Sequence, residues 1–264
     1  MKKILCIIIG FLFLSCEKEL DFEYHSITPE LVIEGILTED GIKVSLTNTT
    51  PMNEPFSDMR LSDAKVVCED METGDIIYLY PDKENFYTNS FEGLIGHRYI
   101  LKVEREDKIF ESECEMRKAP EILDMEFQWI KMPYDHVAVL QISFKDFNTP
   151  EDFYWLKVYR NDEPYKWIIS DDRSAVNGVI NEVIMTSRKN LDEEDEKDIL
   201  REGDIVKVAI NTISREMYDY LIALENDSNG PSMFSGNYCL GYFMASGVSI
   251  DSIVFHPDDL PYFN

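Results

Sequence analysis

The sequence predicts a mainly β fold: an N-terminal immunoglobulin-like β-sandwich followed by a second antiparallel β region with one helix. Three observations lead to this prediction. Short segments of alternating apolar and polar residues recur about every ten residues, which is typical of immunoglobulin-like sandwiches. Aromatic residues, which favour strands, make up 12% of the chain. Turn dipeptides such as Asp40-Gly41 separate the segments.

Seven short strands are expected in the N-terminal sandwich, which we assign to residues 30–119. The first two, at 31–37 and 42–47, flank the Asp40-Gly41 turn and therefore form a hairpin. The other five are expected at 64–68, 76–80, 86–88, 99–104 and 109–114. Pro120 ends this unit, because proline has no N–H group to donate to a strand ladder.

Residues 120–264 are assigned to the second β-rich domain. Its clearest strand is 137–144, in which every second residue, from Ala138 to Phe144, is apolar, as a half-buried antiparallel strand requires. Further strands are expected at 152–159, 167–170, 182–185, 205–211, 238–245 and 248–255. The strongly charged segment 189–201 is expected to be a solvated loop or a frayed helical turn.

One helix is expected near 214–225. Ser214 can cap the first amide groups, and Glu216 suits the positive end of the helix dipole. Apolar residues then recur on one face of the helix. The polar segment 226–231, which contains Gly230, ends it.

The first sixteen residues have the pattern of a secretory signal. Lys2 and Lys3 precede an apolar run at 4–14, which is too short to cross a bilayer as a helix. Ser15 and Cys16 close the run in the manner of a bacterial lipoprotein signal. We therefore expect a signal peptide at 1–15, a lipid on Cys16 and a tether at 16–29.

The charge and the cysteines restrict the partners and the chemistry. A formal net charge of −26 repels phosphates and anionic lipids, which excludes nucleic acid binding and electrostatic membrane binding. We interpret the acidity as a means of solubility, in preference to cation binding or a basic partner. After processing, Cys68, Cys114 and Cys239 remain. Cys68 and Cys114 could form a disulfide, or all three could be buried free thiols.

The sequence predicts no catalytic residue, no cofactor and no metal site. Serine-hydrolase elbows, zinc-protease helices, P-loops and dinucleotide-binding loops are absent from it. Four histidines are widely separated, and we interpret each as structural or exposed: His25, His97, His136 and His256. A hydrolase built from two scattered carboxylates stays an alternative, because glycosidases need only such a pair.

The candidates for a ligand or ion contact are Asp171, Asp172 and Arg173, which follow a predicted strand and precede the Asn177-Gly178 turn. Adjacent carboxylates beside an arginine could hold calcium or an amine. The favoured interpretation is local: Arg173 pairs within the segment while the aspartates accept hydrogen bonds from turn amides.

Three other segments allow both a binding and a structural interpretation. Asp146, Asn148, Glu151 and Asp152 offer oxygen atoms in a loop but lack the pattern of a calcium-binding loop, and the acidic run 192–198 is interpreted as solvated. Trp155, Tyr159, Tyr165 and Trp167 could stack on sugars or peptides, but aromatic residues at alternating strand positions more often fill a core.

The order of segments resembles the DUF4249 family of Bacteroidetes lipoproteins. The matching pieces are LVIEGIL at 31–37, 96–103, 170–173, Asn177-Gly178, 202–206, 218–220, Gly236-Asn237 and 240–243. They cover nearly the whole mature chain, and their order and spacing carry the resemblance. The charged stretch Glu17-Lys18-Glu19 is similar to the signal that sends such lipoproteins to the cell exterior.

The resemblance implies an outer-membrane protein that is anchored through a lipid on Cys16 and exposed at the cell surface. It implies an accessory or ligand-binding component of a TonB-dependent nutrient uptake system, with a TonB-dependent receptor as partner. Together with the membrane tether and the lack of a recognisable catalytic motif, it leads us to expect no enzymatic activity. A surface adhesin-like or structural interaction protein and an uncharacterised hydrolase are the alternatives. The family supplies no catalytic residues to assign.

Overall fold

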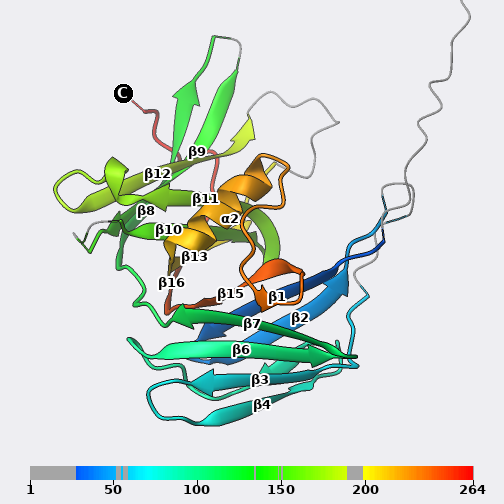
Figure 1. The fold of residues 1–264 in the computed structure, drawn as a ribbon. Coiled ribbons are helices and arrows are strands. Elements are labelled where there is room, and N and C mark those ends of the chain that lie inside the picture. The colour runs from blue at the N-terminus through cyan, green and yellow to red at the C-terminus, as the bar shows by residue number, and fades with distance from the viewer. Residues whose placement is uncertain are drawn as a thin grey trace, which may run out of the picture. The chain divides into compact units, whose positions relative to one another are not determined.

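A computed structural model describes residues 28–51, 55, 59–133, 135–147, 149, 151–188 and 199–263 (Figure 1). The predicted signal peptide, Cys16, Asn148 and the acidic run 192–198 lie outside these residues. One compact unit, Glu30–Thr49 with Asp58–Asn264, contains every strand and helix of the described residues. The fold of this unit is mainly β, as predicted.

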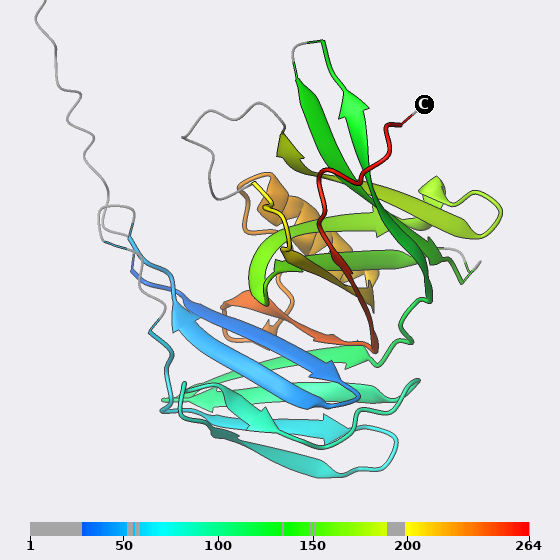
Figure 2. The same ribbon diagram turned by 180° about the vertical axis from the view of Figure 1, so that it is seen from behind.

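The first sandwich is formed by nine strands in the hydrogen-bonded order β14-β7-β6-β3-β4-β5-β2-β1-β15. The strands are β1 (Leu31–Thr38), β2 (Gly41–Asn48), β3 (Lys65–Asp70), β4 (Ile76–Pro81), β5 (Tyr87–Asn89), β6 (Arg98–Arg105), β7 (Lys108–Glu115), β14 (Ser235–Gly236) and β15 (Leu240–Ala245). The predicted hairpin at Asp40-Gly41 is present as β1 and β2, and Figure 2 shows this pair from the opposite side.

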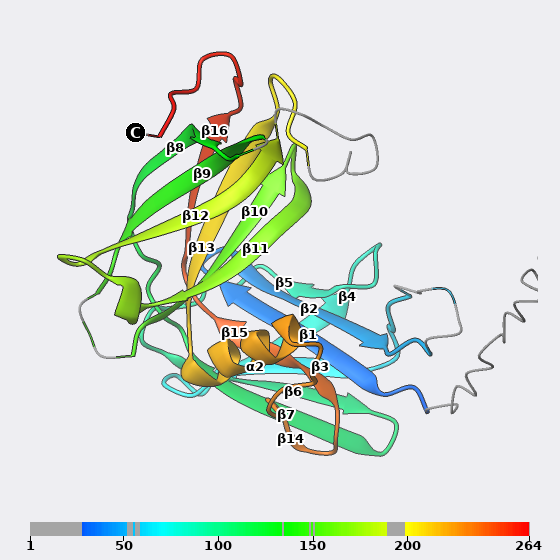
Figure 3. The same ribbon diagram turned by 90° about the horizontal axis from the view of Figure 1, so that it is seen from above.

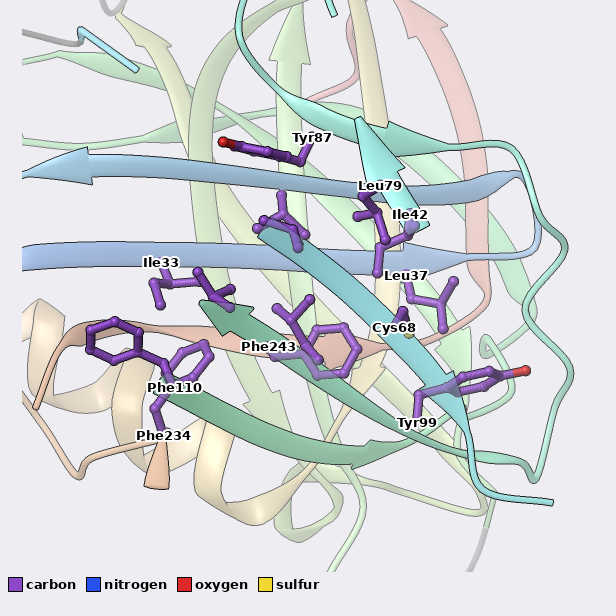
Figure 4. Close-up of a cluster of buried hydrophobic side chains, with 14 of the residues drawn as sticks. Ile33, Leu37, Ile42, Cys68, Leu79, Tyr87, Tyr99, Phe110, Phe234 and Phe243 are labelled. Atoms are coloured by element: carbon purple, nitrogen blue, oxygen red, sulfur yellow. The ribbon is translucent and has the colours of Figure 1, made fainter. Parts of the chain in front are cut away.

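The core of the first sandwich is built by strand alternation. In β1, Ile33 and Leu37 are fully buried, while Glu34 between them is exposed. They share one cluster with Leu101 of β6 and Phe110 of β7. Figure 4 draws 14 of the buried side chains of this core, with Ile33, Leu37 and Phe110 labelled. Burial of apolar surface contributes about 25 cal/mol of folding free energy per Å². Clusters of this kind therefore dominate the stability of a sandwich.

The second region is also a sandwich. Its strands form the orders β11-β10-β13-β16 and β12-β9-β8. They are β8 (Ile122–Lys131), β9 (His136–Lys145), β10 (Phe153–Arg160), β11 (Glu163–Asp171), β12 (Val179–Arg188), β13 (Ile205–Ile213) and β16 (Val248–Val254). The two sheets share one core, in which the apolar face predicted for 137–144 is buried throughout. Strand β8 is not among the predicted strands, although Phe127 and Trp129 alternate in it.

Residues 214–247, between β13 and β16, leave the second sandwich and add strands to the first. We call this segment the linking arm. Its strand β15 pairs in parallel with β1, and its short strand β14 pairs with β7 (Figure 3). The sequence pattern places 238–245 in the second region, and this assignment is wrong. The segment joins the first sandwich because β1 and β7 would otherwise be edge strands with unpaired amides, and because Phe243 fits the first core.

The predicted helix is present as α2 (Arg215–Glu225) in the linking arm. Ser214 caps it as expected, since its Oγ accepts a hydrogen bond from the Met217 amide at 3.2 Å. Met217 and Leu221 are buried in a third cluster, which also contains Phe153 of β10 and Tyr242 of β15. The helix therefore packs against strands of both sandwiches.

All three cysteines in the described part of the chain are free thiols. Cys68 and Cys114 lie on β3 and β7, which β6 separates in the sheet. Burial raises the pKa of Cys68 and that of Cys239 to about 12. These two thiols therefore stay protonated and act as core residues.

Candidate functional site

The predicted contact residues form a short turn directly after β11. The 3₁₀ turn η1 (Asp172–Ser174) begins there, and Asp171 caps it by accepting a hydrogen bond from the Arg173 amide at 3.0 Å. The Asp171 carboxylate also accepts from Arg173 Nε at 2.9 Å and from the Tyr218 hydroxyl at 2.9 Å. The Arg173 guanidinium holds the pKa of Asp171 below its usual value.

The second aspartate of this group has a different partner. Asp172 accepts a hydrogen bond from the Glu151 amide at 2.9 Å. The structure thus brings Asp171 and Arg173 together, and the Asp171 carboxylate is bound by Arg173 and by Tyr218 of α2. This arrangement agrees with the favoured local interpretation. Asp171 has a structural role, because its hydrogen bond with Tyr218 connects α2 to the end of β11.

We expect Asp171→Ala to lower the free energy of unfolding by about 1–2 kcal/mol at pH 7, because the cap and the Tyr218 bond are lost. The folded-state pKa of Asp171 is lowered. Its contribution is therefore complete above the unfolded-state value of about 3.9 and disappears as the pH falls through the lower folded-state value. Urea unfolding at pH 7 and at acid pH should show the two proteins converging. Asp172→Ala is the matched control, and equal losses from both variants would contradict the assignment.

The loop carboxylates are also engaged within the chain. Asp146 is 4% exposed and accepts a hydrogen bond from the Tyr154 hydroxyl at 2.7 Å. Asp152 accepts one from the Thr149 amide at 3.1 Å. Both side chains therefore have a structural role at the end of the second sandwich.

The aromatic residues singled out in the sequence are mostly packing groups. Trp155 is 9% exposed and makes edge-to-face contacts with Trp167 and Tyr242, at centroid distances of 6.4 and 6.0 Å. The Tyr165 hydroxyl donates to the carbonyl of Thr186. This agrees with the core-filling interpretation. Trp167, which is 37% exposed, is the most accessible of this group.

A groove of about 740 Å³ lies on the outer face of β1, β2 and β5. The alternation that points Ile33 into the core points Glu34 and Ile36 outward, and in β2 it points Lys43 and Ser45 outward beside them. The lining residues are Glu34, Ile36, Thr38, Asp40, Gly41, Ile42, Lys43, Ser45, Phe86, Thr88, Asn89, Ser90 and Tyr242.

The groove combines aromatic rings with both signs of charge. Lys43 Nζ lies 3.5 Å from the centre of the Phe86 ring, and Arg60 Cζ lies 3.9 Å from the same ring. The Ser45 hydroxyl donates to Glu34 at 3.2 Å. Burial raises the pKa of Tyr242, so its hydroxyl stays neutral and can donate a hydrogen bond. Apolar walls with a few polar groups of fixed position are typical of binding sites for small molecules or peptides.

Sequence reasoning did not find this groove. Lys43, Phe86 and Tyr242 lie far apart in the chain, and only the pairing of β15 with β1 brings Tyr242 to the other two. The available signal was the outward position of Lys43 in the alternating segment 42–47.

The described histidines pair with acids or a phenol. Nδ1 of His97 lies 2.9 Å from Asp70, Nδ1 of His136 lies 2.9 Å from the Tyr262 hydroxyl, and Nδ1 of His256 lies 2.6 Å from Glu202. His25 lies outside the described residues. A second acid, Glu72, lies beside the pair of His97 and Asp70.

The family profile described as "Domain of unknown function (DUF4249)" matches residues 17–251. The chain belongs to the DUF4249 family. The DUF4249 match includes both sandwiches and the whole linking arm, and it ends within β16. The groove residues therefore all lie within the family region.

Solved structures that align with this DUF4249 chain include a cytokine receptor complex (crystal form 1A) and a segment of two fibronectin type III domains from chicken tenascin. The first has 7% sequence identity and a TM-score of 0.28, and the alignment covers 85% of this chain and 95% of the receptor-complex chain. The second has 10% sequence identity and a TM-score of 0.25, and the alignment covers 86% of this chain and 99% of the tenascin segment. No curated protein matches the sequence. Among the described residues, no helix is long and apolar enough to cross a membrane.

Proposed function

We propose that this DUF4249 protein is a non-enzymatic outer-membrane lipoprotein, anchored through Cys16 and exposed at the cell surface, that serves as an accessory or ligand-binding component of a TonB-dependent uptake system. The groove on β1, β2 and β5 is the observation that carries the proposal. The signal pattern that ends at Cys16 and the family resemblance support the location and the partner.

The composition of the groove supports binding. Lys43 and Phe86 line the groove together, with the Lys43 ammonium over the Phe86 ring, and Arg60, which does not line the groove, contacts the same ring. Each exposed contact of this kind contributes about 0.5–1 kcal/mol. A partner loop or solute that offers an acidic group beside an apolar one would contact both parts of this wall.

Purification in mild detergent should recover a TonB-dependent receptor with the wild-type chain. We expect the double variant Lys43→Ala, Phe86→Ala to retain its strand-rich circular dichroism and lose most of the receptor, because the wall of the groove is removed. Cys16→Ser should leave the protein without acyl chains in mass spectrometry and release it from the membrane.

Lys131→Ala is the matched control, since this exposed lysine lies on β8, in the other sandwich. Equal recovery of the receptor with the double variant would remove the groove from the proposal. Failure of the wild type to recover any such receptor would remove the uptake system from it. Acyl chains absent from Cys16 in the native protein would contradict the anchor.

A further inference from the structure

Three metal-ligating side chains meet where the β3–β4 turn contacts the start of β6. Asp70 ends β3, Glu72 lies in the turn, and His97 precedes β6. One ligand atom from each side chain lies within 4.8 Å of the other two. Asp70 and Glu72 are far from His97 in the sequence, and the pairing of β3 with β6 brings them together.

The chain holds each of these ligands in place. The Asp70 Oδ1 atom accepts hydrogen bonds from the amides of Glu72, at 2.9 Å, and Thr73, at 3.2 Å, which leaves Oδ2 facing His97 Nδ1 at 2.9 Å. The Glu72 carboxylate accepts a hydrogen bond from the Arg98 amide at 2.6 Å. The His97 ring stacks on Tyr99 at an interplanar angle of 24°.

The group is partly buried and partly open to solvent. Asp70 is 6% exposed, and two backbone amides hold its carboxylate in position. The side chains of Glu72 and His97 are 33% and 25% exposed, so an ion can reach them from solvent.

We propose that Asp70, Glu72 and His97 form a binding site for a divalent transition-metal ion, with Zn²⁺ as the ion that fits best. One imidazole nitrogen with two carboxylate oxygens is a donor set for zinc and its neighbours, whereas calcium and magnesium take oxygen ligands. Water would complete the coordination. The proposal is independent of the groove and of the proposed uptake function.

Binding requires the donor atoms to rearrange, because they lie within 4.8 Å of one another and not at the separations that a bound ion sets. On binding, His97 Nδ1 gives up the proton that faces Asp70, and the neutral imidazole carries its one proton on Nε2 by exchange with solvent. The metal ion then takes the place between Nδ1 and Asp70 Oδ2. Tetrahedral zinc with bonds of about 2.0–2.2 Å sets its donor atoms about 3.4 Å apart. The present separation of 2.9 Å must therefore widen by roughly half an ångström, which the partly exposed His97 ring can accommodate.

Arg98 competes with an ion for Glu72. Its Nε lies 3.4 Å from Glu72, and its Nη1 lies 3.4 Å from Glu113. The guanidinium is 55% exposed, so it can turn to Glu113 when an ion binds. Arg98→Met keeps the backbone amide that orients Glu72 and removes the competing charge.

Calorimetric titration of the detergent-solubilised full chain with Zn²⁺ tests the site, and the absorption of bound Co²⁺ reports nitrogen and oxygen ligation. We expect one saturable site in the wild type, loss of it in His97→Ala, and binding weakened by about tenfold or more in Glu72→Gln, which removes the charge of the exposed ligand. Arg98→Met should bind more tightly than the wild type. His256→Ala is the control, because it removes another imidazole–carboxylate pair.

The absence of a saturable Zn²⁺ site in the wild type would overturn the proposal. So would Glu72→Gln and His97→Ala variants that bind Zn²⁺ as tightly as the wild type. Glu72→Gln guards against misfolding as a cause of lost binding, since the glutamine oxygen can still accept from the Arg98 amide. Its thermal unfolding should match that of the wild type without metal and fall below it with Zn²⁺, because the ion stabilises only the protein that binds it.

Discussion

Replacing Gly241 by alanine is expected to lower the free energy of unfolding by about 4 kcal/mol or more. Gly241 has a φ of +103°, and a Cβ atom built on it would lie 1.9 Å from the carbonyl oxygen of Ile33. Ile33 is its partner in the parallel pairing of β15 with β1. The clash is with backbone, so β15 must leave β1 to relieve it. Urea unfolding of the two proteins measures the loss.

Gly74→Ala is the matched control for this substitution. Gly74 has a φ of +78°, but a Cβ atom built on it would meet nothing within 4 Å. Its replacement should cost only the strain of a left-handed backbone, about 1–2 kcal/mol. Equal losses at Gly74 and Gly241 would show that strain alone acts and that β15 does not approach β1 so closely.

The isolated fragment 28–119 is expected not to fold cooperatively. The linking arm places Phe234, Cys239 and Phe243 in the first core, at 7%, 2% and 1% exposure. Removal of one buried phenylalanine side chain costs about 3–5 kcal/mol, and a whole domain is stable by only about 5–15 kcal/mol. The fragment should bind a hydrophobic dye, give a weak near-ultraviolet circular dichroism signal and unfold without a sharp transition.

A peptide of residues 230–247, which carries β14 and β15, should restore a cooperative transition to this fragment. The same peptide with Phe243→Ala provides the control, because it retains the backbone pairing and lacks a large, fully buried core side chain. A fragment that alone unfolds as sharply as the full chain would show that the linking arm only covers a core that is already complete.

Local patterns predicted local structure well. The alternation of 137–144 predicted β9 and its buried face, and Ser214 predicted the start of α2. Strand β8 was missed, because two alternating aromatic residues, Phe127 and Trp129, are a weak signal among polar neighbours. The position of β15 depends on which exposed edge in the folded protein needs a partner, and a segment's own residues do not specify that.

The candidate sites were harder to predict for a related reason. Asp171 and Arg173 lie close together in the sequence, and the structure uses them locally. The groove and the group around His97 instead unite side chains from separate strands and turns, and each member alone is an ordinary residue of its strand or turn. The spacing of these residues along the sequence does not predict such groups, because strand pairing sets the distances between their members.

The parallel pair of β1 and β15 also affects the order in which the chain can fold during its synthesis. Its partners, such as Ile33 and Gly241, are separated by about 200 residues, so the ribosome makes β1 long before β15 exists. A chain that emerges with its N-terminus first must therefore keep β1 and β7 as unsatisfied edges while β8 to β13 and α2 follow. Such edges associate with other chains. Aggregation of newly made protein should consequently depend on chaperones that hold the N-terminal half until its last strands arrive.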